Sequence, residues 1–143
     1  GHCIPVDPGY LAQTARDTGS PLTFVEKALE FNHQMGDVIA TRAQKELGTL
    51  TGKKILVIGI AYKPNVSDVR QSPAKNLIYA LLAKGAIVSW HDDLVGQWKG
   101  QSSVPISSDF DLAILVNPHN QTNLAALGEM KILDVRVTNY RPI

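Results

Sequence analysis

The sequence predicts an α/β fold in which a long helix precedes an open, mostly parallel sheet. Two apolar runs, ILVIGIA at 55–61 and DLAILVN at 111–117, are typical of strands buried on both faces. Helical patterns alternate with these strands, which favours right-handed crossovers between parallel strands. The predicted architecture is Rossmann-like. Because such sheets bind ligands beyond the carboxyl ends of their strands, we expect the binding site at the loop after Gly59.

The first 50 residues predict a loop and two helices. Residues 1–9, GHCIPVDPG, contain two prolines and two glycines, a composition that favours a turn-rich loop. A short helix is expected at 10–18. The longest periodic pattern runs over 21–47, where apolar residues recur three and four apart, and a helix of this length spans about 40 Å. Its broad apolar stripe suits packing on a neighbouring domain, on a second copy of the chain, or on both; a core helix of this domain alone is the alternative.

Beyond the long helix, short strands and helices alternate. The predicted order is a strand at 55–61, a loop as far as residue 71, a helix from Ser72-Pro73 to Lys84, a strand at 86–92, an irregular stretch at 93–110 with at most a short helix and a short strand, a strand at 111–117, a helix at 120–127 and a last strand at 131–136. Ser72 and Pro73 suit a helix start, and Gly85 suits a helix end.

Composition excludes several classes of partner. Fourteen Lys and Arg against thirteen Asp and Glu leave a formal charge of +1 without a basic stripe, so we expect no nucleic-acid binding. No apolar run approaches the about 18 residues of a membrane span, and no signal pattern is present, so we expect no membrane binding and a cytoplasmic location. The single cysteine, Cys3, excludes an internal disulfide, and the four histidines lack zinc-ligand spacing. The chain opens on Gly1 without Met, and we expect it to be part of something longer.

The loop after Gly59 lacks the glycines of a dinucleotide fingerprint. Ile60, Ala61 and Tyr62 follow Gly59 directly, so G-x-G-x-x-G is absent and NAD is not expected to bind there in the standard way. Lys63 and Arg70 instead precede a helix N-terminus, which suits a phosphate. The alternative is a solvated Lys63 and an Arg70 that pairs with Asp68. Similarly, Asp92 either accepts hydrogen bonds from a ribose or, as we favour, caps the next segment.

Cys3 and Asp7, near the start of the chain, are a second pair of candidate functional residues. A thiolate attacks an aldehyde carbon, and a neighbouring carboxylate orients or deprotonates the water that later cleaves the adduct. The alternative is a cysteine that serves only as a small buried hydrophobe. His2 is adjacent to Cys3, but neighbouring side chains usually point apart, and we assign it no role.

Two motifs together resemble one enzyme family. GHCIPVDPGYL at the start and GIAYKPNVSDVRQSPAKNLIYALLAKGAIVSWHD at 59–92 occur in the order, and with the long helix between them, that is found in the nucleotide-sugar dehydrogenases, the UDP-glucose/GDP-mannose dehydrogenase family. The resemblance extends from Gly1 to about Arg136. The form GHCIPVDP is most similar to the branch that oxidises UDP-N-acetylhexosamines such as UDP-N-acetylmannosamine.

The resemblance implies an enzyme and its parts. Residues 1–50 would be the end of a central helical dimerisation region with the catalytic loop, residues 51–143 would be a UDP-binding Rossmann-like domain, and helix 21–47 would form a homodimer. An NAD-binding domain would lie outside these residues, so the chain alone is expected to be inactive. The implied reaction oxidises a sugar C6 hydroxyl to a uronic acid in two NAD-dependent steps, through a thiohemiacetal and a thioester.

The resemblance also implies roles for individual residues. Cys3 would be the nucleophile, and Asp7 would assist proton transfer with the hydrolytic water. Tyr62 and Lys63 would contact the nucleotide-sugar, Arg136 would contact substrate as well, and Arg70 would reach the cofactor. The chain departs from the family pattern in lacking the upstream glycine-rich stretch, lysine and asparagine, and in having Asn117 where threonine is common. The rival interpretation is a non-catalytic nucleotide-binding or dimerisation module in which Cys3 is inert.

Overall fold

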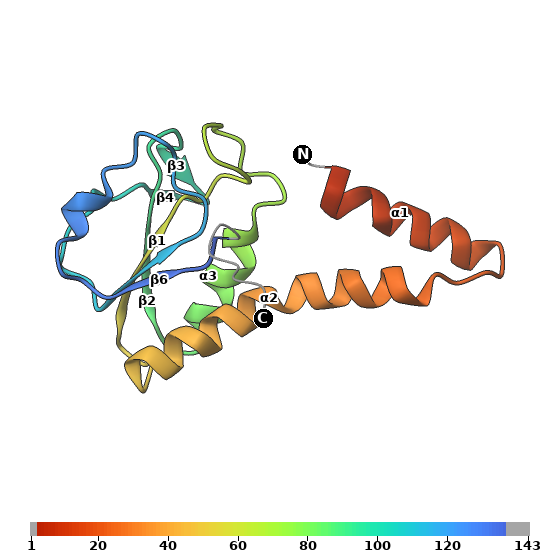
Figure 1. Cartoon of the computed structure of the whole chain (residues 1–143), viewed down its shortest axis with the longest axis horizontal. Helices are drawn as coiled ribbons and strands as arrows, with labels where there is room; N and C mark the ends of the chain where they lie inside the picture. Colours follow the sequence, from red (N-terminus) through yellow and green to blue (C-terminus); the bar gives the residue numbers. More distant parts are fainter. Residues whose placement is uncertain (1–2, 137–143) are drawn as a thin grey trace, which may run out of the picture. The chain divides into compact units, whose positions relative to one another are not determined.

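The computed structural model describes residues 3–136, and the chain divides into two compact units, Gly1–Met35 and Gly36–Ile143. Gly1, His2 and residues 137–143 lie outside the described residues. Helix α2 (Thr23–Leu47) belongs to both units and confirms the long helix predicted at 21–47 (Figure 1). No described helix combines the length and the apolar character needed to cross a bilayer. In the described residues, no group of three or more His, Cys, Asp or Glu side chains could hold a metal ion.

The first unit contains α1 (Cys3–Asp17) and the beginning of α2. The loop expected at 1–9 is therefore wrong from Cys3 onward, because the helix begins there and includes Pro8. Pro8 is the sixth residue of this helix, past the first turn, so it lacks the N–H that would otherwise donate to the carbonyl of Ile4, and the helix continues to Asp17 without that hydrogen bond. An ion pair joins the end of α1 to the start of α2, with Arg16 Nη2 2.8 Å from Glu26 Oε1.

The second unit is built on a four-stranded parallel sheet. Its strands are β1 (Lys54–Ile58), β2 (Ile87–His91), β5 (Leu112–Leu115) and β6 (Ile132–Asp134), in the order β2-β1-β5-β6. The chain leaves β1 to one side for β2 and returns to the other side for β5, so the strand order reverses beside β1. The predicted Rossmann-like α/β fold is confirmed, and the switch point lies where ligands bind in such sheets.

Both faces of β1 are buried from Ile55 onward, which explains the unbroken apolar sequence Ile55–Ile58. Ile55 and Val57 pack in a core with α3 (Pro73–Ala83) and the second half of α2. Leu56 and Ile58 face the opposite way, into a second core that includes Leu127. This second face is covered by the short 3-10 helix η1 (Leu124–Leu127) and by loops. Successive side chains of a strand point to opposite faces, so a strand in this position must be apolar at every residue.

The structure differs from the sequence prediction in two connecting segments. The helix expected at 120–127 is reduced to η1. Ahead of η1, the N–H of Asn120 donates to Oδ1 of Asn65 and the N–H of Thr122 donates to the carbonyl of His119. The irregular stretch at 93–110 contains two paired antiparallel strands, β3 (Gln97–Trp98) and β4 (Gln101–Ser102). The side chain of Trp98 packs edge-on against Trp90, with ring centroids 6.4 Å apart.

A close approach between two helices completes the first core. Gly36, Ala40 and Ala43 are the buried residues of α2 and recur at helical spacing on one side of it. A Cβ atom at Gly36 would lie 2.6 Å from the backbone carbonyl carbon of Asn76 in α3. Small residues on this side of α2 therefore allow the two helix backbones to come nearly into contact.

Candidate functional site

The candidate site lies at the carboxyl ends of the parallel strands, where the loops after β1 and β5 meet. Gly59 directly follows β1 with a φ of +82°, and a Cβ there would lie 2.1 Å from the carbonyl carbon of Asn117. The side chain of Asn117 donates to the carbonyl of Ala61 at 3.0 Å. The loop after β1 is therefore packed directly on the end of β5. The space beside Gly59 is filled by protein backbone, so this turn does not fit a dinucleotide pyrophosphate.

Tyr62 and Lys63 lie on this loop at the edge of the sheet. The N–H of Tyr62 donates to the carbonyl of Asp68 at 2.9 Å, which closes the loop on itself. Lys63 is exposed, and its Nζ lies 5.4 Å from the centre of the Tyr62 ring. No carboxylate pairs with Lys63 within the part of the chain that the structure describes. An ammonium group beside an aromatic ring, at a switch point, can receive an anionic ligand with a flat base.

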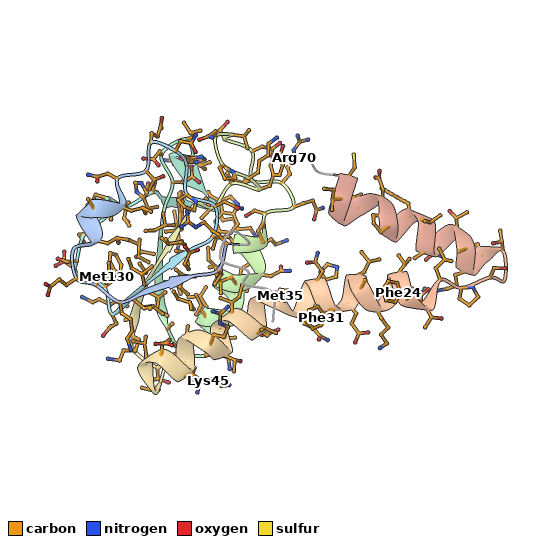
Figure 2. All side chains as sticks on the ribbon, in the orientation of Figure 1. Phe24, Phe31, Met35, Lys45, Arg70 and Met130 are labelled. Carbon is orange, nitrogen blue, oxygen red and sulfur yellow. The ribbon has the colours of Figure 1, made fainter. Side chains whose placement is uncertain are left out.

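Arg70 is engaged by a carboxylate of its own loop. Its Nε lies 3.1 Å from both oxygens of Asp68, and its Nη2 lies 2.7 Å from Oδ2. These hydrogen bonds, and then the carboxylate charge, raise the pKa of Arg70 above its ordinary value. The pairing that the sequence left as an alternative is therefore present. The side chain remains 77% exposed and lies at the surface of the loop (Figure 2).

Arg136 lies just beyond β6, at the same carboxyl edge of the sheet. Its Nε lies 2.9 Å from Oδ1 of Asp134, and this hydrogen bond is the main cause that raises the pKa of Arg136. Since β6 is separated from β1 only by β5, Arg136 and the loop carrying Lys63 share one edge of one sheet. The structure thus brings Arg136, Tyr62 and Lys63 to the same edge.

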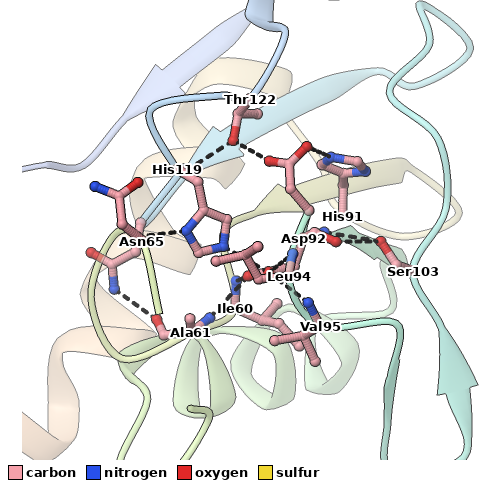
Figure 3. A network of polar contacts seen from close by, with 12 residues as sticks. Ile60, Ala61, Asn65, His91, Asp92, Leu94, Val95, Ser103, His119 and Thr122 are labelled. Atoms are coloured by element: carbon pink, nitrogen blue, oxygen red, sulfur yellow. Dashed lines mark hydrogen bonds and ion pairs between the residues drawn. The ribbon is translucent and has the colours of Figure 1, made fainter. Parts of the chain in front are cut away.

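Asp92 organises the interior of this edge, as Figure 3 shows. Its Oδ2 accepts from the N–H groups of Ile60 at 2.9 Å and Ala61 at 3.2 Å. Its Oδ1 accepts from the N–H groups of Leu94 and Val95, both at 3.0 Å. The expected capping role is confirmed. The carboxylate is wholly buried and has its lone pairs occupied by protein donors, which leaves none for a ribose.

His119 is a member of the site that the sequence analysis missed. Its side chain is wholly buried, with Nε2 2.7 Å from Asp92 Oδ1 and Nδ1 2.7 Å from the N–H of Asn65. A second contact between the same loops runs from the N–H of Asn120 to Oδ1 of Asn65, at 2.9 Å. The available signal in the sequence was a polar run, NPHN, directly after a buried strand.

Cys3 and Asp7 belong to the first unit. They are four residues apart on α1, so they lie on the same face of the helix, one turn from each other. Both are exposed. Cys3 is therefore not a buried hydrophobe in this chain, and its sulfur is accessible to a ligand. The residues of the sheet edge belong to the second unit, Gly36–Ile143.

Comparison with known proteins finds similarity to one enzyme family. Residues 56–136, more than half of the chain, match the profile described as "UDP-glucose/GDP-mannose dehydrogenase family, UDP binding domain". Over 94 residues the chain is 35% identical to the UDP-glucose 6-dehydrogenase TuaD of Bacillus subtilis, which covers 66% of this chain and 20% of that protein. Over 94 residues it is 37% identical to a UDP-N-acetyl-D-mannosamine dehydrogenase of Methanococcus maripaludis, covering 64% and 21% respectively. The chain thus spans about a fifth of the length of these relatives.

A solved structure shows the same fold. The UDP-D-ManNAc dehydrogenase of Pyrococcus horikoshii superposes with a TM-score of 0.74 at 23% identity, over 99% of this chain and 36% of that one. The profile match shows more than fold, because it spans the sheet from β1 to Arg136, including the loops that carry Lys63 and His119. Residues 56–136 match the model of the family's UDP binding domain, and the chain belongs to the UDP-glucose/GDP-mannose dehydrogenase family.

Proposed function

We propose that the chain is the UDP-binding portion of an NAD-dependent nucleotide-sugar dehydrogenase that oxidises the C6 hydroxyl of a UDP-sugar to a uronic acid. The observation that carries the proposal is the exposed Lys63 beside Tyr62 at the sheet's switch point, within the matched UDP-binding domain and with no carboxylate partner among residues 3–136. In this proposal residues 51–143 form the UDP-binding domain and residues 1–50 end a central helical region. The relatives named above act on UDP-glucose and UDP-N-acetyl-D-mannosamine, and the form GHCIPVDP favours a UDP-N-acetylhexosamine.

The nucleotide is held at the sheet edge by complementary charge and shape. Lys63 faces the diphosphate, Tyr62 contacts the nucleotide-sugar, and Arg136 contacts it from the end of β6. The attraction between the ammonium group and a phosphate is strongest where water is partly excluded. Half-buried Tyr62 shields one side of the Lys63 ammonium group from water.

Calorimetric titration of UDP into the chain tests this step. We expect binding by the natural chain and at least about tenfold weaker binding by Lys63→Ala, since one hydrogen bond to a charged group is worth about 1.5–3 kcal/mol. Lys45→Ala, which removes the same charge from the exposed last turn of α2, is the matched control and should bind as the natural chain does. Absence of binding, or equal binding by Lys63→Ala, would contradict the proposal.

The covalent chemistry is assigned to Cys3 and Asp7. The Cys3 thiolate bonds to the C6 aldehyde carbon, and after oxidation of this adduct a water cleaves the thioester, with Asp7 accepting a proton from that water. When bound, NAD supplies the two hydride acceptors that the four-electron oxidation needs. The turn after β1 does not fit that cofactor, and Arg70 is the one residue of this chain that we assign to contact it.

Alkylation of Cys3 separates the enzyme from the rival, a binding module with an inert cysteine. Cys3 is the sole cysteine of the chain, so the rate of iodoacetamide labelling reports on it alone, with Cys3→Ser as the blank. We expect UDP-N-acetylmannosamine to slow labelling, and the free sugar without its nucleotide to leave the rate unchanged. A chain that binds UDP in the calorimeter but is alkylated equally fast with and without the UDP-sugar would support the binding module instead.

A homodimer through α2 is part of the proposal. Phe24 and Phe31, labelled in Figure 2, are 86% and 62% exposed, and with Lys27, Ala28, Glu30 and Gln34 they line a groove along the helix. Exposed aromatic side chains at helical spacing are typical of a buried interface in the assembled protein. In sedimentation experiments we expect a dimer that Phe24→Glu with Phe31→Glu converts to a monomer, while Leu82→Glu on α3 remains dimeric. A monomeric natural chain at all concentrations would refute this part.

A further inference from the structure

The buried ring of His119 connects three segments that are far apart in the sequence. Its Nε2 contacts the carboxylate of Asp92 at the end of β2, and its Nδ1 contacts the backbone N–H of Asn65 in the loop after β1. The ring itself belongs to the loop after β5. Figure 3 shows the three groups in line, with the imidazole between the carboxylate and the loop backbone. Each nitrogen is 2.7 Å from its partner, and the side chain has no exposed surface.

The partners determine where the ring carries its proton. A backbone N–H can only donate, so Nδ1 of His119 must accept from Asn65 and carries no proton. The proton is then on Nε2, which donates it to Oδ1 of Asp92. An imidazolium would present an N–H to the N–H of Asn65 and lose that contact. The His119–Asp92 contact is therefore a hydrogen bond between a neutral ring and a carboxylate, although its distance alone would also fit an ion pair.

The same contacts hold the first half of the loop at residues 60–71 at two points. Asp92 accepts from the N–H groups of Ile60 and Ala61 at the start of this loop. His119 accepts from Asn65, a residue with a φ of +62°, immediately after the Tyr62–Lys63–Pro64 segment. One continuous chain of hydrogen bonds thus brackets Tyr62 and Lys63, and no member of it is one of the residues proposed to touch the ligand.

We propose that His119 is a positioning residue of the nucleotide site: its neutral, Nε2-protonated ring couples Asp92 to the backbone of Asn65 and so holds the loop in the conformation that presents Tyr62 and Lys63. The inference rests on the proposed function only for the identity of the ligand as a nucleotide. The ring is wholly buried and both of its nitrogens are hydrogen-bonded, so these two bonds are the contacts through which it can hold the loop.

Two substitutions of His119 distinguish the hydrogen bond made by Nδ1 from the one made by Nε2. In His119→Asn, Oδ1 takes the position of Nδ1 and can still accept from Asn65, but the side chain no longer reaches Asp92. In His119→Gln, Nε2 can still donate to Asp92, but the acceptor at the Nδ1 position is lost. Glutamine is closer to histidine in size. A purely space-filling role therefore favours Gln over Asn, whereas positioning of the loop favours Asn over Gln.

Three measurements on the full chain test the inference. The ¹⁵N resonances of the His119 ring should show a non-protonated Nδ1 and a protonated Nε2. In His119→Gln the Asn65 amide should exchange with solvent about tenfold faster, while His119→Asn keeps its protection, since one net hydrogen bond corresponds to roughly a factor of ten. The Kd for UDP should rise about tenfold in His119→Gln and less in His119→Asn. Asn65→Gly, which keeps the backbone N–H and tolerates the positive φ, is the control that should retain exchange protection of residue 65.

The outcomes are separable from those of the proposed function. If the natural chain binds no UDP, the nucleotide proposal fails, but the ring resonances and the amide exchange still decide whether His119 holds the loop. A protonated Nδ1, equal exchange of the Asn65 amide in the Asn and Gln variants, or tighter UDP binding by His119→Gln than by His119→Asn would each overturn the inference. Should one variant fail to fold, the ring resonances of the natural chain and the remaining variant give the answer.

Discussion

Replacement of Gly36 by alanine tests the packing of α2 on α3. Alanine is the better helix former and by itself would stabilise the helix by about 1 kcal/mol. Its Cβ, however, would lie 2.6 Å from the carbonyl carbon and 2.7 Å from the carbonyl oxygen of Asn76, where ordinary contacts begin at 3.4 Å. Both obstacles are backbone atoms, so no side-chain rotation relieves them.

The two effects can be weighed against each other. To reach an ordinary contact distance, α2 must move away from α3 by about 0.8 Å, the difference between 3.4 Å and 2.6 Å, which loosens the packing of Ala40 and Ala43. Overpacking of this kind costs about 3 kcal/mol when the obstacle is backbone. We therefore expect Gly36→Ala to lower the free energy of unfolding by about 2 kcal/mol, a change of about 30-fold in the folding equilibrium.

Urea unfolding followed by tryptophan fluorescence measures this change. Both tryptophans, Trp90 and Trp98, lie in the second unit, so the signal reports on the part of the chain where α2 meets α3. The midpoint should fall by about 1 M. Gly9→Ala is the matched control, because Gly9 is also inside a helix but a Cβ there would meet nothing within 4 Å. It should leave the fluorescence transition unchanged and increase the helical circular dichroism. A Gly36→Ala chain as stable as the natural one would refute the close approach.

Three further predictions concern the sheet edge and its flank. Gly59→Ala should destabilise the fold by about 3 kcal/mol or more in the same assay, because it adds positive-φ strain to a Cβ placed 2.1 Å from the backbone of Asn117; an unchanged midpoint would contradict the contact. Asp92→Asn should lower the free energy of unfolding by about 3 kcal/mol, because an amide cannot accept from all five donors that the carboxylate serves, namely Ile60, Ala61, Leu94, Val95 and His119. An unfolding midpoint in urea equal to that of the natural chain would contradict this. Asp111 accepts from the N–H of Lys54 and, second, from the ammonium group of Lys53, and these contacts hold its pKa below the ordinary 3.8. Its contribution to stability is thus present above that value and is lost as the pH falls through the lower pKa of the folded state, so between about pH 6 and about pH 3 the unfolding midpoint of Asp111→Asn should fall less than that of the natural chain. Equal falls would show that Asp111 does not contribute to the acid sensitivity.

Local sequence pattern was sufficient for the central strands and for α2. Ile55–Ile58 and Leu112–Leu115 are apolar at every position because both of their faces are covered, and this requirement is visible in the sequence. The capping pair Ser72-Pro73 similarly marks the start of α3, where the Ser72 hydroxyl accepts from the N–H of Ala74. By contrast, the prolines and glycines of residues 1–9 suggested a loop, but a helix begins at Cys3 and continues through Pro8, where one backbone hydrogen bond is missing.

Sequence alone determined the fold class, the family resemblance and the candidate status of Cys3, Asp7, Tyr62, Lys63, Arg70 and Arg136. It left open whether Arg70 pairs with Asp68 and what Asp92 does, since both questions depend on donors supplied by other segments. Only the tertiary structure placed His119 between Asp92 and Asn65, residues 27 and 54 positions away from it in the chain. A histidine that is hydrogen-bonded to a loop and to the end of a strand leaves no periodic pattern in a sequence. Its partners are determined by the order of β2, β1 and β5 in the sheet, which brings the carboxyl ends of these strands together, and not by their spacing along the chain.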